Sequence, residues 1–178
     1  AGGLHSCGLG VGGRLGHGDE RQVLLPKRVS LGARRVVSVA AALDVSLLVD
    51  EGGSVLSWGA RHAPLGYEVE GAAQCTPRQV RFGAAREVAR EAAREAVVLV
   101  AAVAAANGHC LAVARDGRLF AWGSNACGQL GMPPSACPVS ITPCAVHLNL
   151  ANGASGAVHI VSAAAGPAHS AAVCAEGR

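Results

Sequence analysis

Several features that would indicate a particular chemistry are scarce in this sequence. Aromatic residues make up only 3% of the chain, and the formal net charge is just +3. The basic residues are scattered, apart from small clusters at 27–28 and 34–35, whereas a nucleic-acid-binding domain is expected to concentrate them in one patch. The longest apolar run, residues 96–106, is too short to span a bilayer. The sequence therefore carries no strong nucleic-acid signal and no predicted membrane span.

The seven cysteines lack the spacing of a metal site or of a disulfide framework. No Cys-x-x-Cys pair occurs, and the spacing of Cys137 and Cys144, in a proline-rich loop, is too loose to indicate zinc by itself. An odd number of cysteines without framework spacing indicates an intracellular, reducing compartment. We therefore predict no metal site.

The glycine-rich stretch from Gly8 to Gly13 matches the Gly-x-Gly-x-x-Gly pattern of dinucleotide sites. Such a site needs a helix that opens on the loop, so that its amide N–H groups and its dipole meet the pyrophosphate. Residues 14–19 contain two more glycines and no helical periodicity, which argues against a nucleotide. The histidines and carboxylates likewise form no recognisable Ser-His-Asp or paired-carboxylate set. We predict no cofactor, no catalytic residue and no enzymatic activity.

What the sequence does contain is an internal repeat, marked by Trp58–Gly59 and Trp122–Gly123. Residues 45–59 and 109–123 match along their length, and each consists of two short apolar runs joined by a turn, as at Asp116–Gly117. An Asp-Gly pair between apolar runs predicts a β-hairpin, because glycine supplies the positive φ that a tight turn needs. A further strand is predicted before each hairpin, at residues 36–40, 98–102 and 158–162.

The same register divides the chain into three units at about residues 1–52, 53–116 and 117–178. Cys7 takes the tryptophan position in an earlier copy of the motif, and each copy is followed by a Leu-Gly pair. A unit of this kind is a small antiparallel sheet that is too thin to bury its own faces, so the units must stack. Recurrence gives a structural interpretation to these positions: Trp58, Gly59, His109, Gly117, Trp122, Gly123, Gly128 and His169.

These motifs resemble the regulator-of-chromosome-condensation repeat family, whose members form seven-bladed β-propellers. The best match runs from Val100 to Gly131 and includes Trp122-Gly123-Ser124-Asn125. The resemblance implies that residues 1–178 are an all-β, partial propeller with about three blades. Three blades of seven do not close a ring, so we expect the chain to belong to a longer protein or to meet partner chains at its ends. The family pattern is broken at Cys7, at residues 44–46 and at residues 61–65.

One segment, residues 84–96, departs from the repeat by insertion. It consists of strong helix formers, and its arginines and its glutamates each recur every four residues, with alanines and Val88 on the opposite side. The pattern predicts a short surface helix. The same helix is a candidate docking element, and its candidate partner-binding residues are Arg86, Glu87, Arg90, Glu91 and Arg94.

The resemblance implies a binding platform. We predict a non-catalytic protein–protein interaction or scaffold module that is a subunit of a larger intracellular assembly and has proteins as its partners. The alternative is a guanine-nucleotide exchange factor, in which case a small GTPase is one of those partners. The family's acting residues for exchange cannot be assigned to positions in this sequence.

Overall fold

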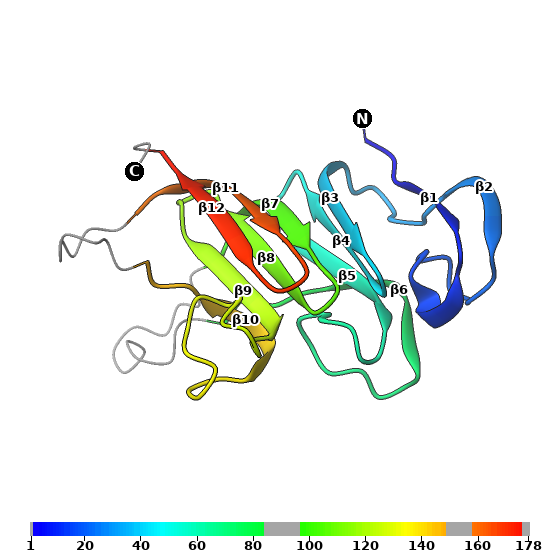
Figure 1. The fold of residues 1–178 in the computed structure, drawn as a ribbon. Helices are drawn as coiled ribbons and strands as arrows, with labels where there is room; N and C mark the ends of the chain where they lie inside the picture. Colours follow the sequence, from blue (N-terminus) through cyan, green and yellow to red (C-terminus); the bar gives the residue numbers. More distant parts are fainter. Residues whose placement is uncertain (1, 84–96, 149–157, 176–178) are drawn as a thin grey trace.

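The computed structural model describes residues 2–83, 97–148 and 158–175, and it is almost entirely β-structure (Figure 1). Within these ranges twelve strands form four antiparallel sheets, and the single helix is the 3₁₀ turn η1 (Val11–Gly13). The all-β prediction is therefore confirmed. The predicted helical insertion at 84–96 lies outside the described residues. In the part that is described, no helix has the length and apolar character needed to cross a bilayer.

Two of the sheets have four strands each, and two have two strands each. Sheet A pairs β1 (His5–Gly8) with β2 (Val23–Arg28), and sheet D pairs β11 (Ile160–Ala165) with β12 (Ser170–Cys174). Sheet B has the order β3 (Val36–Ala42), β4 (Val45–Asp50), β5 (Val55–Ala60) and β6 (Ala73–Gln79). Sheet C has the order β7 (Val100–Ala105), β8 (His109–Ala114), β9 (Leu119–Ser124) and β10 (Val139–Ala145).

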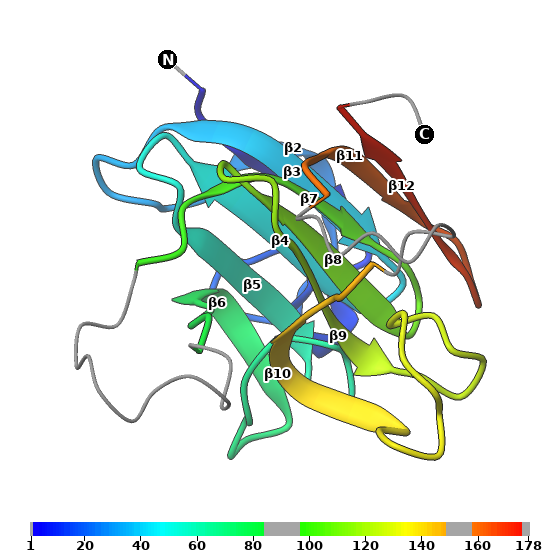
Figure 2. The same cartoon turned by 90° about the vertical axis from the view of Figure 1, so that its left-hand side faces the viewer.

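The sheets stand side by side, and in sheets B, C and D the first strands are neighbours (Figure 2). Strand β3 contacts β7, and β7 contacts β11. Backbone hydrogen bonds of 2.9–3.1 Å tie the start of these strands to a glycine in or just before the preceding sheet: Val36 to Gly2, Val100 to Gly53 and Ile160 to Gly117. Sheets arranged around a common inner edge define a β-propeller. The predicted partial propeller of about three blades is confirmed.

The repeat in the sequence is offset from the sheets of the structure. Residues 52–53 and 116–117, where the sequence units meet, lie in the turns between β4 and β5 and between β8 and β9. A sequence unit therefore joins the last two strands of one sheet to the first two strands of the next. Strands β1 and β2 correspond to β5 and β6, whereas β11 and β12 correspond to β3 and β4. The four sheets thus amount to two complete blades and two complementary half blades.

A proline lies in the outermost strand of sheets A, B and C, at Pro26, Pro77 and Pro143. Proline has no N–H for a sheet ladder, so it is tolerated at an edge. The pairing of β6 with β5 and of β10 with β9 also shifts register close to these prolines. Each outermost strand begins three or four residues before its proline, at Val23, Ala73 and Val139, and ends two residues after it.

The hydrophobic core lies between sheets. Leu48, Leu56 and Trp58 pack at the interface of sheets A and B. Leu47, Phe120 and Trp122 belong to the cluster between sheets B and C. Leu111, Leu130 and Ile160 fill the interface of sheets C and D. Strands β4 and β8 are buried at nearly every position because both faces of their sheets are covered. Full burial of one such leucine contributes about 1.5–3 kcal/mol.

Candidate partner-binding face

The tryptophans of the repeat are buried, and they link neighbouring sheets. Trp58 and Trp122 are 2% and 0% exposed. The indole Nε1 of Trp58 donates to the backbone carbonyl of Arg14 at 2.8 Å, and that of Trp122 donates to the carbonyl of Pro64 at 2.8 Å. Both acceptors stand directly before the Leu-Gly pair of the preceding unit. Each indole therefore fastens the loop of one sheet to the next sheet.

A second side chain meets the same carbonyl in each of these interfaces. The residue paired with the tryptophan on the neighbouring strand is Ser46 or Cys110. The Ser46 hydroxyl donates to that oxygen at 2.9 Å, and the Cys110 thiol donates at 3.5 Å. Between sheets C and D the counterpart is Ser170, which donates to the carbonyl of Gln129 at 2.7 Å. The repeat thus encodes a recurring contact between sheets.

Gly59 and Gly123 follow the tryptophans because the backbone opposite leaves no room for a side chain. Their φ angles are +142° and +107°. A Cβ on Gly59 would collide with the carbonyl oxygen of Asp44, and one on Gly123 would collide with that of Gly108. The remaining repeat glycines lie in the β8–β9 turn and in the loop after β9, at Gly117 and Gly128. These positions support the structural interpretation, which stays a prediction until substitution tests it.

His109 is fully buried, and its partner determines its tautomer. Its Nε2 lies 2.8 Å from the Oγ of Ser170, whose single hydroxyl proton is donated to Gln129. The Nε2 atom must therefore carry the imidazole hydrogen, and Nδ1 has no hydrogen-bond partner in the described part of the chain. Burial, and to a smaller extent the charge of His169, lowers the pKa of His109. His169, its counterpart in the repeat, is exposed.

The candidate residues of the insertion, Arg86, Glu87, Arg90, Glu91 and Arg94, fall in 84–96 and so lie outside the described residues. Their role in partner binding stays a prediction. The described chain instead brings together a different set of polar and charged residues, two of which, Asp44 and His62, come from places where the repeat is broken. Because these residues sit on three loops that meet at one end of sheets A and B, we name them the loop face: Arg14, Asp44 and His62, with the pocket beside them.

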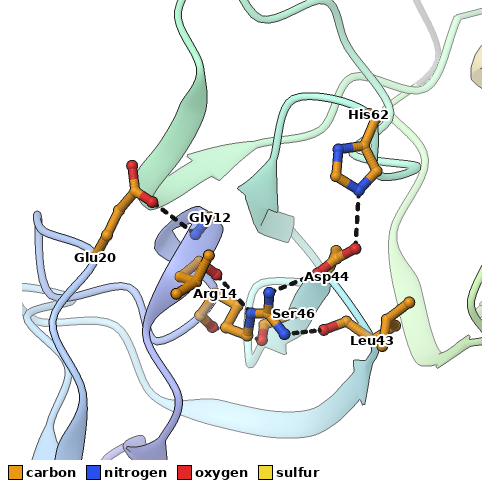
Figure 3. Close-up of polar contacts among 8 residues, drawn as sticks. Gly12, Arg14, Glu20, Leu43, Asp44, Ser46 and His62 are labelled. Carbon is orange, nitrogen blue, oxygen red and sulfur yellow. Dashed lines mark hydrogen bonds and ion pairs between the residues drawn. The ribbon is translucent and has the colours of Figure 1, made fainter.

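The loop face is held together by the carboxylate of Asp44 (Figure 3). Arg14 comes from the loop after β1, Asp44 from the β3–β4 turn and His62 from the loop after β5. The Arg14 guanidinium lies 2.7 Å from Asp44 Oδ1, and His62 Nε2 donates to Asp44 Oδ2 at 2.8 Å. A carboxylate between two donors stabilises the relative position of three loops.

Arg14 is fixed from several sides. Its guanidinium also donates to the backbone carbonyls of Leu43 at 2.7 Å and Val11 at 2.6 Å. The side chains of Arg14 and Asp44 are 21% and 17% exposed, whereas that of His62 is 76% exposed. The network therefore holds the exposed imidazole of His62 on a well-bonded Arg14–Asp44 pair.

A pocket of about 510 Å³ opens beside His62, between sheets B and C. One wall is the loop after β5, with Tyr67 and Val69, and the other is the start of β10, with Val139 and Ile141. Both β10 side chains are more than half exposed, at 58% and 51%. Apolar walls open to solvent in this way are typical of a surface that is covered by a partner.

Tyr67 is a fixed part of the pocket wall. Its hydroxyl donates to the carbonyl of Ser57 at 2.7 Å, and the guanidinium of Arg78 lies over its ring, 4.5 Å from the centroid. Burial raises the pKa of Tyr67, although the hydrogen bond and Arg78 act in the opposite direction. The hydroxyl is therefore protonated at neutral pH and remains a donor.

The chemistry of the loop face suits binding. Across residues 2–83, 97–148 and 158–175, no group of three or more His, Cys, Asp or Glu side chains is placed to hold a metal ion. The glycine-rich stretch from Gly8 to Gly13 ends in the three-residue turn η1, so the helix dipole that a dinucleotide site needs is not formed there. The carboxylate of Asp44 is engaged by two cations or donors of its own chain.

The sequence identifies the breaks in the repeat at 44–46 and 61–65 but assigns no role to Asp44 or His62. The two residues lie 18 positions apart, and Arg14 lies on an earlier loop. The pairing of β4 with β5 within sheet B brings Asp44 close to His62, and the stacking of sheets A and B adds Arg14. The available signal is the departure from the repeat itself, because a charged residue at a broken position has no recurring structural contact to make.

The stacked sheets and their tryptophan contacts define this chain as a β-propeller segment built from Trp-Gly repeats. The family model of the regulator of chromosome condensation (RCC1) repeat matches residues 1–49 and 116–173, and a second RCC1 repeat model matches residues 100–129. The chain belongs to the RCC1 repeat family.

Its relatives are longer proteins with different activities. The human probable E3 ubiquitin-protein ligase HERC6 is 30% identical over 178 residues, a match that covers 98% of this chain and 16% of HERC6. The secretion-regulating guanine nucleotide exchange factor of Bos taurus is 33% identical over 128 residues, which is 70% of this chain and 26% of that protein. The crystal structure of human WBSCR16 superposes with a TM-score of 0.74 at 25% identity and covers 99% of this chain and 41% of that chain. The chain spans less than half the length of each.

Proposed function

We propose that this chain is a non-catalytic protein-interaction module that binds a protein partner through its loop face. The observation that carries this proposal is the difference in burial between the recurring tryptophans and a residue at a break in the repeat. The recurring Trp58 and Trp122 are buried in contacts between sheets, whereas His62, at a break in the repeat, is exposed on one face. Because hydrogen bonds within the chain already hold these loops in place, they lose little conformational entropy when a partner binds, which favours affinity.

Site-specific photo-crosslinking tests the proposal. The photoreactive residue p-benzoylphenylalanine replaces His62 on the loop face or Asp116 in the turn at the opposite end of the sheets, where the side chain is 54% exposed. We expect irradiation in an extract of the source organism to give protein adducts of discrete mass from position 62 and not from position 116. Adducts of equal yield from both positions, or none from position 62, contradict the proposal.

The same proposal covers the other parts of the molecule. The units 1–52, 53–116 and 117–178 act together as one propeller segment, and the insertion at 84–96 is a second candidate contact surface through Arg86, Arg90 and Arg94. The odd number of cysteines supports placement in a reducing intracellular compartment. The partners are proteins of a larger assembly.

A guanine-nucleotide exchange function is the alternative, and the similarity to the bovine secretion-regulating exchange factor favours it. An exchange factor must accelerate release of bound nucleotide from a small GTPase. Release of a fluorescent GDP analogue from a panel of small GTPases measures this directly. Acceleration by the full chain that is saturable and specific to one GTPase replaces the scaffold proposal, whereas unchanged release rates across the panel support it.

A further inference from the structure

The loops after β1, β5 and β9 are equivalent in the repeat but differ in length. Counted from Gly8, Gly59 and Gly123 to the next Leu-Gly pair, the loop after β5 is one residue shorter than the other two. The position that holds Asn125 in the third loop holds Arg61 in the second. This difference lies between the two complete sheets, B and C.

In the first loop, the turn η1 packs directly on the neighbouring sheet. A Cβ on Gly12 would lie 2.9 Å from the Cβ of Ala60, and a Cβ on Gly13 would lie 2.8 Å from the Cα of Cys75. The N–H of Gly12 also donates to the carboxylate of Glu20 at 2.8 Å, which secures the turn (Figure 3). The backbone of η1 therefore fills the space between sheets A and B at the loop face.

The shorter second loop leaves the equivalent space open. By strand register, Ser124 is the counterpart of Ala60 and Ile141 is the counterpart of Cys75. Both counterparts line the pocket of about 510 Å³. The pocket between sheets B and C therefore occupies the place that η1 fills between sheets A and B.

The third loop shows what Arg61 has replaced. Asn125 is fully buried, and its side chain knits the loop together through hydrogen bonds to the carbonyls of Met132 and Cys137 and from the N–H of Leu130, at 2.7–3.1 Å. Arg61 is exposed on the rim of the pocket, and within the described ranges no side-chain hydrogen bond or ion pair engages its guanidinium. Among the described residues, an unpaired guanidinium therefore lies beside the apolar side chains of the pocket.

We propose that this pocket receives an extended segment of a protein partner in which an apolar side chain stands next to an Asp or Glu. The apolar side chain packs against Val69 and Ile141, and the carboxylate pairs with Arg61. The inference rests on the proposed interaction function and names the chemistry of the partner. Apolar β10 side chains are unsuited to phosphate groups, which are bound by clustered cations, so a protein segment is favoured over a nucleic acid.

A peptide selection tests the proposal. A library of random peptides displayed on phage is selected against the full chain, and the enriched peptides are synthesised for affinity measurement. We expect an apolar residue adjoining an Asp or Glu to recur among them. Their affinity should fall about tenfold with Arg61→Glu and about tenfold with Ile141→Asp, since each change removes one half of the recognition. Replacing the acidic residue of the peptide by its amide should have a similar effect.

The matched control is Arg81→Glu, which reverses the charge of another exposed arginine that does not line the pocket. Its peptide affinity should equal that of the unsubstituted chain. Circular dichroism and urea unfolding verify that all three variants are folded. Because Arg61 is exposed and Ile141 is 51% exposed, their substitution is expected to leave the fold intact.

Several outcomes overturn the proposal. Equal peptide affinity for all three variants, or failure to enrich any peptide, contradicts it. A consensus of basic residues also contradicts it, because Glu68 would then be the charged residue that the peptides contact. If a labelled oligouridine binds the chain, and its binding is lost with Arg61→Glu but kept with Ile141→Asp, the pocket binds phosphate groups instead. Crosslinking from position 62 together with a failed selection rejects the pocket while leaving the interaction function in place.

Discussion

The indole of Trp122 donates a hydrogen bond of 2.8 Å to the backbone carbonyl of Pro64, which lies 58 positions earlier on the neighbouring sheet. Trp58 and Arg14 repeat this relationship at 2.8 Å across the preceding interface. A motif that is local in the sequence therefore makes its contact between sheets. The Trp-Gly pair therefore marks the contacts that join neighbouring blades. The positions where the repeat is broken are the ones we propose for partner binding.

The first prediction concerns this bond. Trp122→Phe keeps most of the buried apolar surface and removes the N–H donor, so we expect the free energy of unfolding to fall by about 1–2 kcal/mol. Trp122→Ala also leaves a cavity and should cost about 3–5 kcal/mol. Urea unfolding followed by circular dichroism measures both values. A Phe variant as stable as the unsubstituted chain shows that the hydrogen bond contributes nothing.

The second prediction is a pH dependence that arises from His109. Its pKa is lowered in the folded state, mainly by burial, so the unfolded state binds the proton more readily. The folded state therefore has its full stability above about pH 6.5 and loses up to about 1.4 kcal/mol per pH unit as the pH falls below that value. Urea unfolding between pH 8 and pH 5 measures this slope.

His109→Gln provides the control for that dependence. Glutamine can donate to Ser170 in place of the imidazole but cannot titrate. The variant is expected to be less stable than the unsubstituted chain at pH 8, and the difference should shrink as the pH falls. A difference that stays constant across this range shows that another group is responsible.

The third prediction addresses the loop face. Arg14 and Asp44 lie 2.7 Å apart and are only about one fifth exposed, so their interaction should be stronger than that of a fully exposed pair. A double-mutant cycle with Arg14→Ala and Asp44→Ala is expected to give a coupling energy of about 1 kcal/mol. The pair Arg118 and Asp116, which is about half exposed, serves as the comparison and should give a smaller value. Equal coupling at the two pairs contradicts the prediction.

The fourth prediction concerns cysteine reactivity. Burial raises the pKa of the Cys110 thiol, and the side chain is fully enclosed, whereas Cys7 and Cys127 are exposed. Because the thiolate is the reactive form, iodoacetamide should modify the exposed pair first. Cys110 should react at least about a thousandfold more slowly than the exposed cysteines, because its exposure needs an opening that costs on the order of 5 kcal/mol. Peptide mass spectrometry over time measures the rates; comparable rates at all three sites contradict the structure.

Much of the fold could be predicted because its signals are local. The hairpin of residues 45–59 forms with Val49 opposite Val55 and with Ser46 opposite Trp58, as alternation of apolar runs and a Gly turn requires. The strand expected at 98–102 begins at Val100 and extends to Ala105. Its start is set by the hydrogen bond from Val100 to Gly53 of the neighbouring sheet, and no property of residues 98–102 could reveal that contact.

The candidate site could be predicted only in part. The breaks in the repeat at 44–46 and 61–65 are visible in the sequence, and both proved to lie on the loop face. Their meeting with Arg14 depends on how closely sheets A and B stack, which is decided by side-chain volumes at the interface. The sequence likewise shows that the second loop is a residue short, but not that the missing turn leaves a pocket beside Ile141.

By itself, the sequence determined the strands, the turns and the phase of the repeat, because hydrophobic period and glycine placement act within a few residues. It also determined that the units must stack, since no single sheet can bury both its faces. Only the tertiary structure decided that the tryptophans bond across sheets and that Arg61 lies beside an open pocket. It also decided that His109 is buried with an Nδ1 that has no hydrogen-bond partner among the described residues. Those features depend on distances between sheets, which are set by the summed packing of many side chains.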